Sequence, residues 1–215
     1  MKRMLVAGAS GLIGTSVLRQ SAANPEIEPI ALLRNPLASP IAGVEQLICD
    51  FEHLDDATLP SADVAICCLG TTIKVAGSQV AFKHVDLELV THFAKAAKRA
   101  GVGCFVMVSA AGASQRSRFF YSQVKARAEH AVEQIGFDSL IIAHPSLLLG
   151  DRDALSRPQR SGESLAQRVG RLLAPITPLA YRPITDQHLA RVLLAYALAA
   201  PAGAYIIHSK ALHSR

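Results

Sequence analysis

The stretch that most restricts how this chain can fold is VAGASGLIG, residues 6–14, which has glycines at positions 8, 11 and 14. The apolar residues before it are typical of a short strand, and the apolar spacing after it is typical of a helix. The amides and the dipole at the start of a helix attract anions, and glycine lets an anion approach them closely. Strand, glycine turn and helix in this order predict a turn that holds a dinucleotide pyrophosphate, although the first glycine spacing is one residue wider than in the usual fingerprint.

Each glycine of this turn has its own expected task. Gly8 lets the chain leave the strand tightly, Gly11 lets backbone amides approach a pyrophosphate, and Gly14 lets the helix pack close to the strand. The alternative is a turn that is merely tight. The residues expected to contact the cofactor here are Gly8, Ser10, Gly11, Leu12, Ile13 and Gly14.

The rest of the chain alternates between short apolar runs and helical spacing. Strands are expected at residues 3–8, 28–34, 44–50, 63–70, 104–110, 139–145 and 204–209, and helices at 11–22, 80–100, 119–135, 164–173 and 186–199. Strands this apolar imply a mostly parallel sheet covered by helices on both faces, so the pattern predicts a Rossmann-type, doubly wound α/β fold. We expect one domain over residues 1–215, with a dinucleotide-binding core at 1–150 and a small substrate-side region at 151–215.

The residue that ends the second expected strand bears on which dinucleotide binds. Chains that prefer NAD(H) place an acidic residue there to bond the ribose 2′-hydroxyl, whereas this chain has Arg34. A guanidinium pairs well with a 2′-phosphate, and Ser10 could add a hydroxyl, so NADP(H) is favoured over NAD(H). The alternative is that Arg34 is simply a solvent-exposed side chain.

Further cofactor contacts are expected where later strands end, because ligands of such sheets bind beyond the carboxyl ends of the strands. Asp50 ends the third strand, where its carboxylate either accepts from the adenine amino group or caps a turn. Leu69, Gly70 and Thr71 follow the fourth strand, and Gly70 lets the backbone lie against the cofactor's ribose and phosphates.

Three residues form a candidate catalytic set. Ser109 ends the fifth strand, and Tyr121 and Lys125 lie four residues apart on one face of the next helix. A Lys ammonium one turn from a Tyr hydroxyl favours the phenolate, and such a Tyr can give a proton to a carbonyl oxygen or take one from an alcohol. Ser109 is expected to hold the same oxygen by a hydrogen bond.

These motifs taken together resemble a short-chain dehydrogenase/reductase of the extended or atypical kind, over roughly residues 3–150. The segments that carry the resemblance are GASGLIG, Arg34, Asp50, CCLGTT, Ser109 and YSQVK. CCLGTT, SAAGA, YSQVKARAE and LLLGDR make the chain most similar to the TIP30-like (HTATIP2-like) NAD(P)-binding proteins. The resemblance implies a Rossmann fold that binds NADPH, and it implies no settled substrate.

Two positions depart from the family's pattern. Asp86 stands where many extended members have Asn; it could anchor a water or Lys125, and its charge would alter the proton relay. His144, Pro145 and Ser146 stand where many members read Arg-Pro-Gly. By the resemblance, Pro145 keeps the turn and the backbone near Ser146 meets the nicotinamide carboxamide.

The leading functional hypothesis is an NADP(H)-dependent oxidoreductase of a small carbonyl or alcohol. In it Tyr121 is the acid and base, Lys125 tunes Tyr121 and orients the ribose, and Ser109 polarises the carbonyl. An epimerase or dehydratase of a nucleotide sugar is a second enzymatic interpretation, which the short carboxy-terminal part disfavours. The alternative from another class is a non-catalytic NADPH-binding protein that senses redox state or regulates a partner.

Charge and apolar content narrow the partners. A formal net charge of +5 permits an anionic ligand, but the chain has no Lys-rich tract and no aromatic residues interleaved with basic ones, so nucleic acid is not expected. The apolar stretch 189–207 contains Arg191 and Pro201, and the amino-terminal segment reads as a strand and a glycine turn rather than a signal peptide. We therefore expect no membrane partner, and we leave a homodimer open.

The cysteines and the carboxy-terminal arginines allow two last expectations. Cys49, Cys67, Cys68 and Cys104 lie in strand-like runs without metal-ligand spacing. They are interpreted as buried thiols in a reducing compartment, so the expected location is cytoplasmic and no metal is expected. The arginine-rich stretch 152–171 either binds an acidic substrate or a protein partner, or is a solvated loop.

Overall fold

The computed structural model describes residues 1–54, 59–146, 148–149 and 183–213. Its strands are β1 (Lys2–Ala7), β2 (Ile27–Leu33), β3 (Glu45–Ile48), β4 (Val64–Cys67), β5 (Cys104–Val108), β6 (Ser139–His144), β7 (Leu148–Leu149), β8 (Ile184–Thr185) and β9 (Gly203–His208). Its helices are α1 (Leu12–Ala22), α2 (Ile73–Ala76), α3 (Gln79–Lys83), α4 (Val90–Arg99), α5 (Phe120–Glu133), α7 (Asp186–Ala199) and α8 (Ser209–Leu212). A 3-10 helix, η1 (Phe51–His53), and a π-helical segment, η2 (His84–Leu89), complete the described elements.

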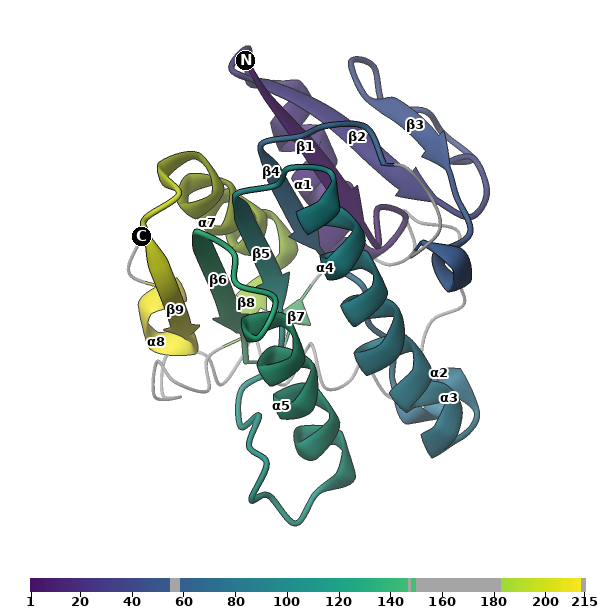
Figure 1. Cartoon of the computed structure of the whole chain (residues 1–215), viewed down its shortest axis with the longest axis vertical. Coiled ribbons are helices and arrows are strands. Elements are labelled where there is room, and N and C mark those ends of the chain that lie inside the picture. The colour runs from purple at the N-terminus through teal and green to yellow at the C-terminus, as the bar shows by residue number, and fades with distance from the viewer. Residues whose placement is uncertain (55–58, 147, 150–182, 214–215) are drawn as a thin grey trace.

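Seven strands form one parallel sheet in the order β3-β2-β1-β4-β5-β6-β9 (Figure 1). On the central strand β1, Val6 lies between Ala31 of β2 and Ile66 of β4. The strand order reverses at this point, because β2 and β3 lie on one side of β1 and the later strands on the other. This confirms the Rossmann-type α/β fold expected from the sequence, and it marks the carboxyl ends of β1 and β4 as the place where such sheets bind ligands.

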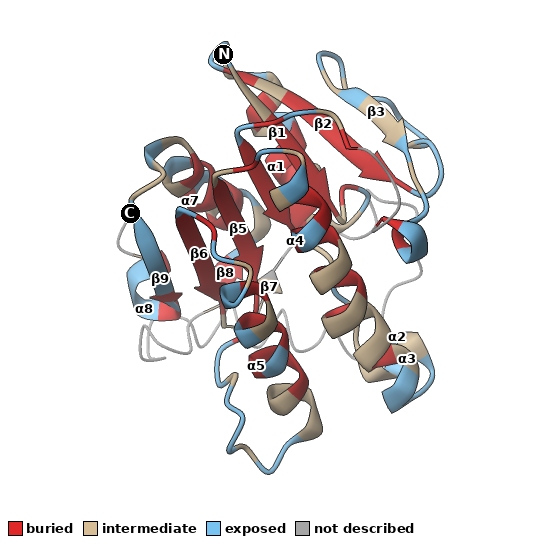
Figure 2. Cartoon of the chain, viewed as in Figure 1, coloured by how far each residue is buried: buried red, intermediate tan, exposed pale blue. Residues whose placement is uncertain are grey.

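An apolar core covers each face of the sheet, because successive residues of a strand point to opposite faces. Val6 and Val106 face the core beneath α1 and α7, whereas Leu5 and Phe105 face the core beneath α4 and α5. Figure 2 shows the central strands buried, whereas the edge strands β3 and β9 carry exposed residues. The polar residues that follow the inner strands are therefore attached to buried, closely packed parts of the sheet.

The helix expected at residues 80–100 differs from a regular α-helix. It runs through α3, η2 and α4 without a break, and its middle part is π-helical. Such π-helical turns occur frequently at functional sites. The helix ends as expected at Gly101, whose φ of +87° closes it. The helix expected at 164–173 and the arginine-rich stretch lie outside the described residues.

Gly8 and Gly14 bring backbone segments closer than any side chain would allow. Gly8 has a φ of +73°, and a Cβ on it would lie 2.4 Å from the carbonyl carbon of Cys68, just after β4. A Cβ on Gly14 would lie 2.3 Å from the carbonyl oxygen of Gly8. The backbone of the glycine turn is therefore in direct contact with the start of α1 and with the end of β4.

We expect Gly8→Ala to lower the free energy of unfolding by at least about 3 kcal/mol, because a backbone collision adds to a left-handed strain of roughly 1 kcal/mol. Gly136→Ala is the matched control: Gly136 has a φ of +75°, but a Cβ there would meet nothing within 4 Å. Urea denaturation followed by circular dichroism measures both variants. An equal loss of unfolding free energy in the two variants would show that the close approach of Gly8 to Cys68 does not contribute to stability.

Candidate functional site

The start of α1 is open to an anion. Gly11 is the N-cap residue and has no side chain with which to cap the helix, and the first turn contains no acidic residue. The first α-helical bond runs from the amide of Thr15 to the carbonyl of Gly11, at 2.9 Å. Helix geometry therefore leaves the amides of Leu12, Ile13 and Gly14 without an intrahelical acceptor. These amides and the positive end of the helix dipole suit a phosphate group.

Arg34 and Asp50 follow β2 and β3 at the same edge of the sheet. Arg34 is exposed and makes no hydrogen bond or ion pair with the residues that the structure describes. Asp50 caps η1, because its Oδ1 accepts from the amide of Glu52 at 3.0 Å and its Oδ2 lies 2.8 Å from Nδ1 of His53. These bonds, that of His53 foremost, hold the pKa of Asp50 below its ordinary value. Of the two interpretations of Asp50, the cap is the one seen, and the adenine contact stays a prediction.

The loop after β4 connects the glycine turn to the candidate catalytic helix. It begins against Gly8, and the amide of Thr71 donates to Oδ2 of Asp86 at 2.8 Å. A Cβ on Gly70 would lie 3.3 Å from Oδ1 of Asp86 and 3.5 Å from Nζ of Lys125. The loop that should face the cofactor and the Lys that should face the substrate therefore meet around one carboxylate.

Asp86 and Lys125 form a buried ion pair. Oδ1 of Asp86 lies 2.7 Å from Nζ of Lys125, and the two side chains are 0% and 7% exposed. Burial works against the ammonium, but the Asp86 carboxylate and then Tyr121 more than offset it, so the pKa of Lys125 is raised above its ordinary value. Lys125 is thus held charged within the site.

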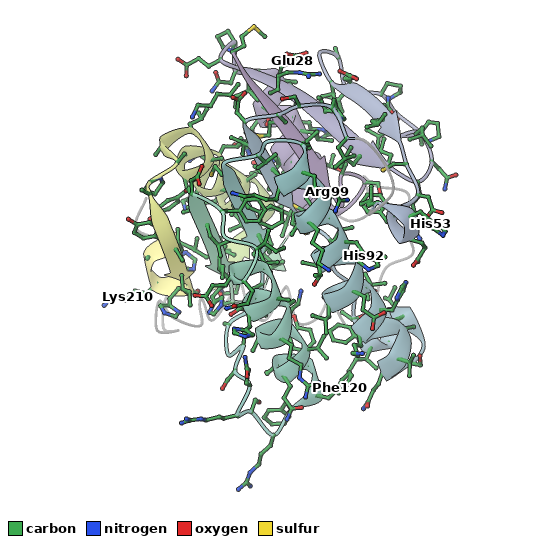
Figure 3. All side chains as sticks on the ribbon, viewed as in Figure 1. Glu28, His53, His92, Arg99, Phe120 and Lys210 are labelled. Carbon is green, nitrogen blue, oxygen red and sulfur yellow. The ribbon has the colours of Figure 1, made fainter. Side chains whose placement is uncertain are left out.

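Tyr121 lies one helical turn before Lys125 on α5 and is partly exposed. Its ring centroid lies 5.3 Å from that of Phe82 on α3. The Phe82 ring also lies 6.1 Å from the ring of Phe120, which Figure 3 labels at the amino-terminal end of α5. Tilted ring contacts at these distances restrict the ring planes, so α3 helps to orient Tyr121.

Ser109 faces a buried carboxylate. Its hydroxyl donates to Oε1 of Glu129 on α5, and the same oxygen lies 2.9 Å from Nε2 of His144 at the end of β6. All three residues are buried, and the exposed His208 lies edge-on to His144 with ring centroids 5.4 Å apart. A hydroxyl has a single proton, so while Ser109 donates it to Glu129 its oxygen can only accept from a ligand.

The remaining expected contacts, Leu69, Pro145 and Ser146, also follow strands at this edge. Leu69 is partly buried against the core beneath α4. Pro145 is buried, and its carbonyl accepts from the amide of Ala111 at 3.0 Å. Ser146 follows it and is partly exposed. The turn after β6 is therefore tied to the loop after β5.

Sequence reasoning missed the partners of Ser109. A signal was present, because Tyr121, Lys125 and Glu129 recur every four residues and so share one face of α5. That face meets η2 through Lys125 and the ends of β5 and β6 through Glu129, and a carboxylate buried there requires donors nearby. The sequence could not say that Ser109 and His144 are those donors, since they belong to two different strands.

The assembled residues fit a dinucleotide. The open amides of α1 would hold the pyrophosphate, and the exposed Arg34 adds positive charge at the end of β2. Among the described residues, no three His, Cys, Asp or Glu side chains are grouped so as to hold a metal ion. No helix in the described ranges is long and apolar enough to cross a membrane.

Comparison with protein families and curated proteins gives a consistent result. A family model described as NAD(P)H-binding matches residues 8–172. Protein HTATIP2 of Rattus norvegicus is 36% identical over 173 residues, which cover 78% of this chain and 69% of the relative. The mitochondrial protein FMP52 of Candida albicans is 32% identical over 172 residues, 77% of this chain and 74% of the relative. The mitochondrial protein FMP52 of Eremothecium gossypii is 31% identical over 198 residues, which cover 90% of this chain and 88% of the relative.

Solved structures support the fold. MoeE5, in complex with UDP-glucose and NAD, has a TM-score of 0.71 at 15% identity, covering 95% of this chain and 74% of its own. The Bordetella bronchiseptica enzyme WbmH, in complex with NAD+, has a TM-score of 0.69 at 14% identity. The match covers 97% of this chain and 76% of WbmH. At such low identity the likeness extends to the fold alone.

The cytoplasmic location expected from the sequence is contradicted by these relatives. The FMP52 proteins of Candida albicans, Emericella nidulans, Meyerozyma guilliermondii and Eremothecium gossypii are all named as mitochondrial. The expectation rested on free cysteines, which indicate reducing surroundings but do not distinguish one reducing compartment from another.

We expect Glu129→Gln to lower the free energy of unfolding by about 1.5–3 kcal/mol, because it weakens two buried hydrogen bonds to a charged acceptor. Glu133→Gln is the matched control, one turn further along α5, where the side chain is exposed and lies 3.9 Å from His130. It should change stability by less than about 0.5 kcal/mol. Urea denaturation at neutral pH compares the two, and a similar small loss in both would contradict the buried network.

Proposed function

This chain belongs to the NAD(P)H-binding family, as a relative of HTATIP2 and FMP52, and from that premise we propose that it is an NADP(H)-dependent oxidoreductase acting on a small carbonyl or alcohol. Tyr121 is the proposed acid and base, Lys125 supports it electrostatically, and Ser109 contacts the substrate oxygen. The glycine turn, Arg34 and the loop at Gly70 hold the cofactor.

One observation carries this proposal more than any other. Gly70, in the loop after β4, lies so close to the Asp86–Lys125 pair that a Cβ on it would be 3.3 Å from Oδ1 of Asp86 and 3.5 Å from Nζ of Lys125. Tyr121 precedes Lys125 by one turn on the same face of α5. A group bound along the glycine turn and this loop would therefore end beside Tyr121, which a charged Lys accompanies. A binding module has no need for that proximity.

The chain's own residues supply the proton chemistry. The bound nicotinamide would supply or accept a hydride. Tyr121 gives its hydroxyl proton to the carbonyl oxygen as a reduction proceeds, or takes the proton of an alcohol in the reverse direction. Lys125 stays charged one turn from Tyr121, paired with the carboxylate of Asp86. Ser109 donates to the substrate oxygen only when its hydroxyl turns away from Glu129.

The preference for NADP(H) is part of the proposal. Arg34 is exposed at the end of β2, where the ribose 2′ position of a bound dinucleotide would lie. Helix α1 brings no acidic residue to its first turn, so nothing there would repel a further phosphate. A guanidinium that is not engaged elsewhere among the described residues is free to pair with it.

A second candidate function rests on a different observation. The hydroxyl of Ser109 is already donated to Glu129, which deprives a carbonyl of one expected donor. A non-catalytic NADPH-binding protein that senses redox state needs no hydroxyl donor for a substrate carbonyl, so the bond between Ser109 and Glu129 would not impair it. The two functions differ in whether bound NADPH is consumed when a panel of carbonyl compounds is offered.

We expect Tyr121→Phe to lower kcat about 10²- to 10⁴-fold, the usual contribution of a positioned acid, and to leave NADPH affinity within about twofold. Absorbance of NADPH measures turnover, and its fluorescence measures binding. Tyr205→Phe is the matched control, since Tyr205 lies on the exposed edge strand β9 and its hydroxyl donates to the carbonyl of Ala202 just before that strand. Loss of binding without a specific loss of turnover would assign Tyr121 a structural role instead.

We expect Arg34→Ala to weaken NADPH binding about 10- to 100-fold and NADH binding hardly at all, because only NADPH loses a charge-assisted hydrogen bond to its 2′-phosphate. Arg191→Ala, which removes an exposed arginine from α7, serves as the control. Fluorescence titration with both cofactors gives the four affinities needed. Equal weakening of NADPH and NADH would overturn the role of Arg34.

A further inference from the structure

Lys125 does not present a lone positive charge to Tyr121. Its ammonium lies 2.7 Å from Oδ1 of Asp86, and the Asp86 side chain is completely buried. The second oxygen, Oδ2, accepts from the amide of Thr71 at 2.8 Å, which fixes the carboxylate in place. Two opposite charges this close act on a third group as a dipole, whose field falls off faster than that of a single charge.

Among the residues that the structure describes, the titratable groups nearest the pair on β4, α5 and η2 do not replace the charge that Asp86 cancels. From β4, Cys67 faces the pair, and burial raises the pKa of its thiol to about 12, so it is neutral at physiological pH. On α5, Glu129 follows Lys125 by one turn but is engaged with Ser109 and His144. On η2, the charged residues other than Asp86 are bound at the surface, where His84 bridges Glu52 and Glu88.

The two sides of the pair have opposite effects on Tyr121. The Lys125 ammonium alone would favour the phenolate, which suits a base that takes a proton from an alcohol. The Asp86 carboxylate opposes that effect and favours the neutral phenol, which suits an acid that gives a proton to a carbonyl. Tyr121 lies one turn from Lys125 on the same face of α5, and Asp86 is in contact with Lys125, so a change of charge at Asp86 alters the field at Tyr121.

We propose that Asp86 is a positioning residue that holds the Lys125 ammonium and cancels its field at Tyr121, which sets the site for reducing a carbonyl. The catalytic consequence rests on the proposed oxidoreductase function, whereas the electrostatic part concerns this chain alone. The proton that reaches the carbonyl oxygen comes from Tyr121, and solvent replaces it on Tyr121 afterwards. Asp86 and Lys125 exchange no proton in this step.

The test is an ultraviolet titration of the cofactor-free full chain, which follows the phenolate absorbance near 295 nm. Four tyrosines are present, so each protein is compared with its own Tyr121→Phe partner, and the difference belongs to Tyr121. In Asp86→Asn the Tyr121 signal should appear at a pH lower by at least about one unit, because the Lys125 charge is no longer cancelled. Asp138→Asn, which removes an exposed carboxylate 3.9 Å from Lys98, should leave it unchanged.

A second variant keeps the test decisive if Asp86→Asn fails to fold. The double variant Asp86→Asn with Lys125→Met removes both charges, so it buries no unpaired ion. If Asp86 cancels the charge of Lys125 in the wild type, the phenolate signal of Tyr121 in the double variant should appear within about half a pH unit of its wild-type position. A signal that instead moves up by more than one unit would mean that Lys125 acts uncancelled. An unchanged or higher pH for the Tyr121 signal in a folded Asp86→Asn would also overturn the proposal.

A kinetic measurement separates this proposal from the proposed function. For a carbonyl that the wild type reduces with NADPH, kcat/KM in Asp86→Asn should decline at a pH about one unit lower than in the wild type. If the titration gives the expected shift but no carbonyl is reduced, the oxidoreductase function fails and the cancellation stands. If carbonyls are reduced but the titration shows no shift, the function stands and the role of Asp86 fails.

Discussion

The buried ion pair between Asp86 and Lys125 is the interaction on which the site depends. It joins three parts of the chain that are far apart in sequence, since Asp86 also accepts from the amide of Thr71 in the loop after β4. A buried charge without its partner is strongly destabilising, so neither residue can move independently. The loop that should face the cofactor and the helix that carries Tyr121 are therefore held in one geometry.

A second constraint acts on the other side of that loop. The backbone after β4 lies so close to Gly8 that no side chain fits between them, and α1 lies equally close through Gly14. Close packing of backbone on backbone leaves the helix start accessible to a ligand while the turn itself cannot shift. The glycine turn and the ion pair thus fix the two ends of one loop.

Much of the fold was accessible to sequence reasoning because its signals are local. The strand, turn and helix around VAGASGLIG, the α/β alternation and the helix ending at Gly101 all follow from apolar spacing and glycine positions within short windows. The Tyr121–Lys125 spacing on α5 is equally local. The π-helical segment was missed, because no local pattern distinguishes it from the α-helix around it.

By itself, the sequence determined the order of the elements, the glycine turn between β1 and α1, and which residues lie at the carboxyl ends of strands. Only the tertiary structure decided the partners of those residues: that Asp86 pairs with Lys125, that Asp50 caps its own turn, and that Ser109 donates to Glu129 beside His144. The physical reason is that strand and helix formation depend on neighbours along the chain. Hydrogen bonds between buried polar groups instead depend on which strands the sheet places side by side, and the strand order arises only when the whole sheet assembles.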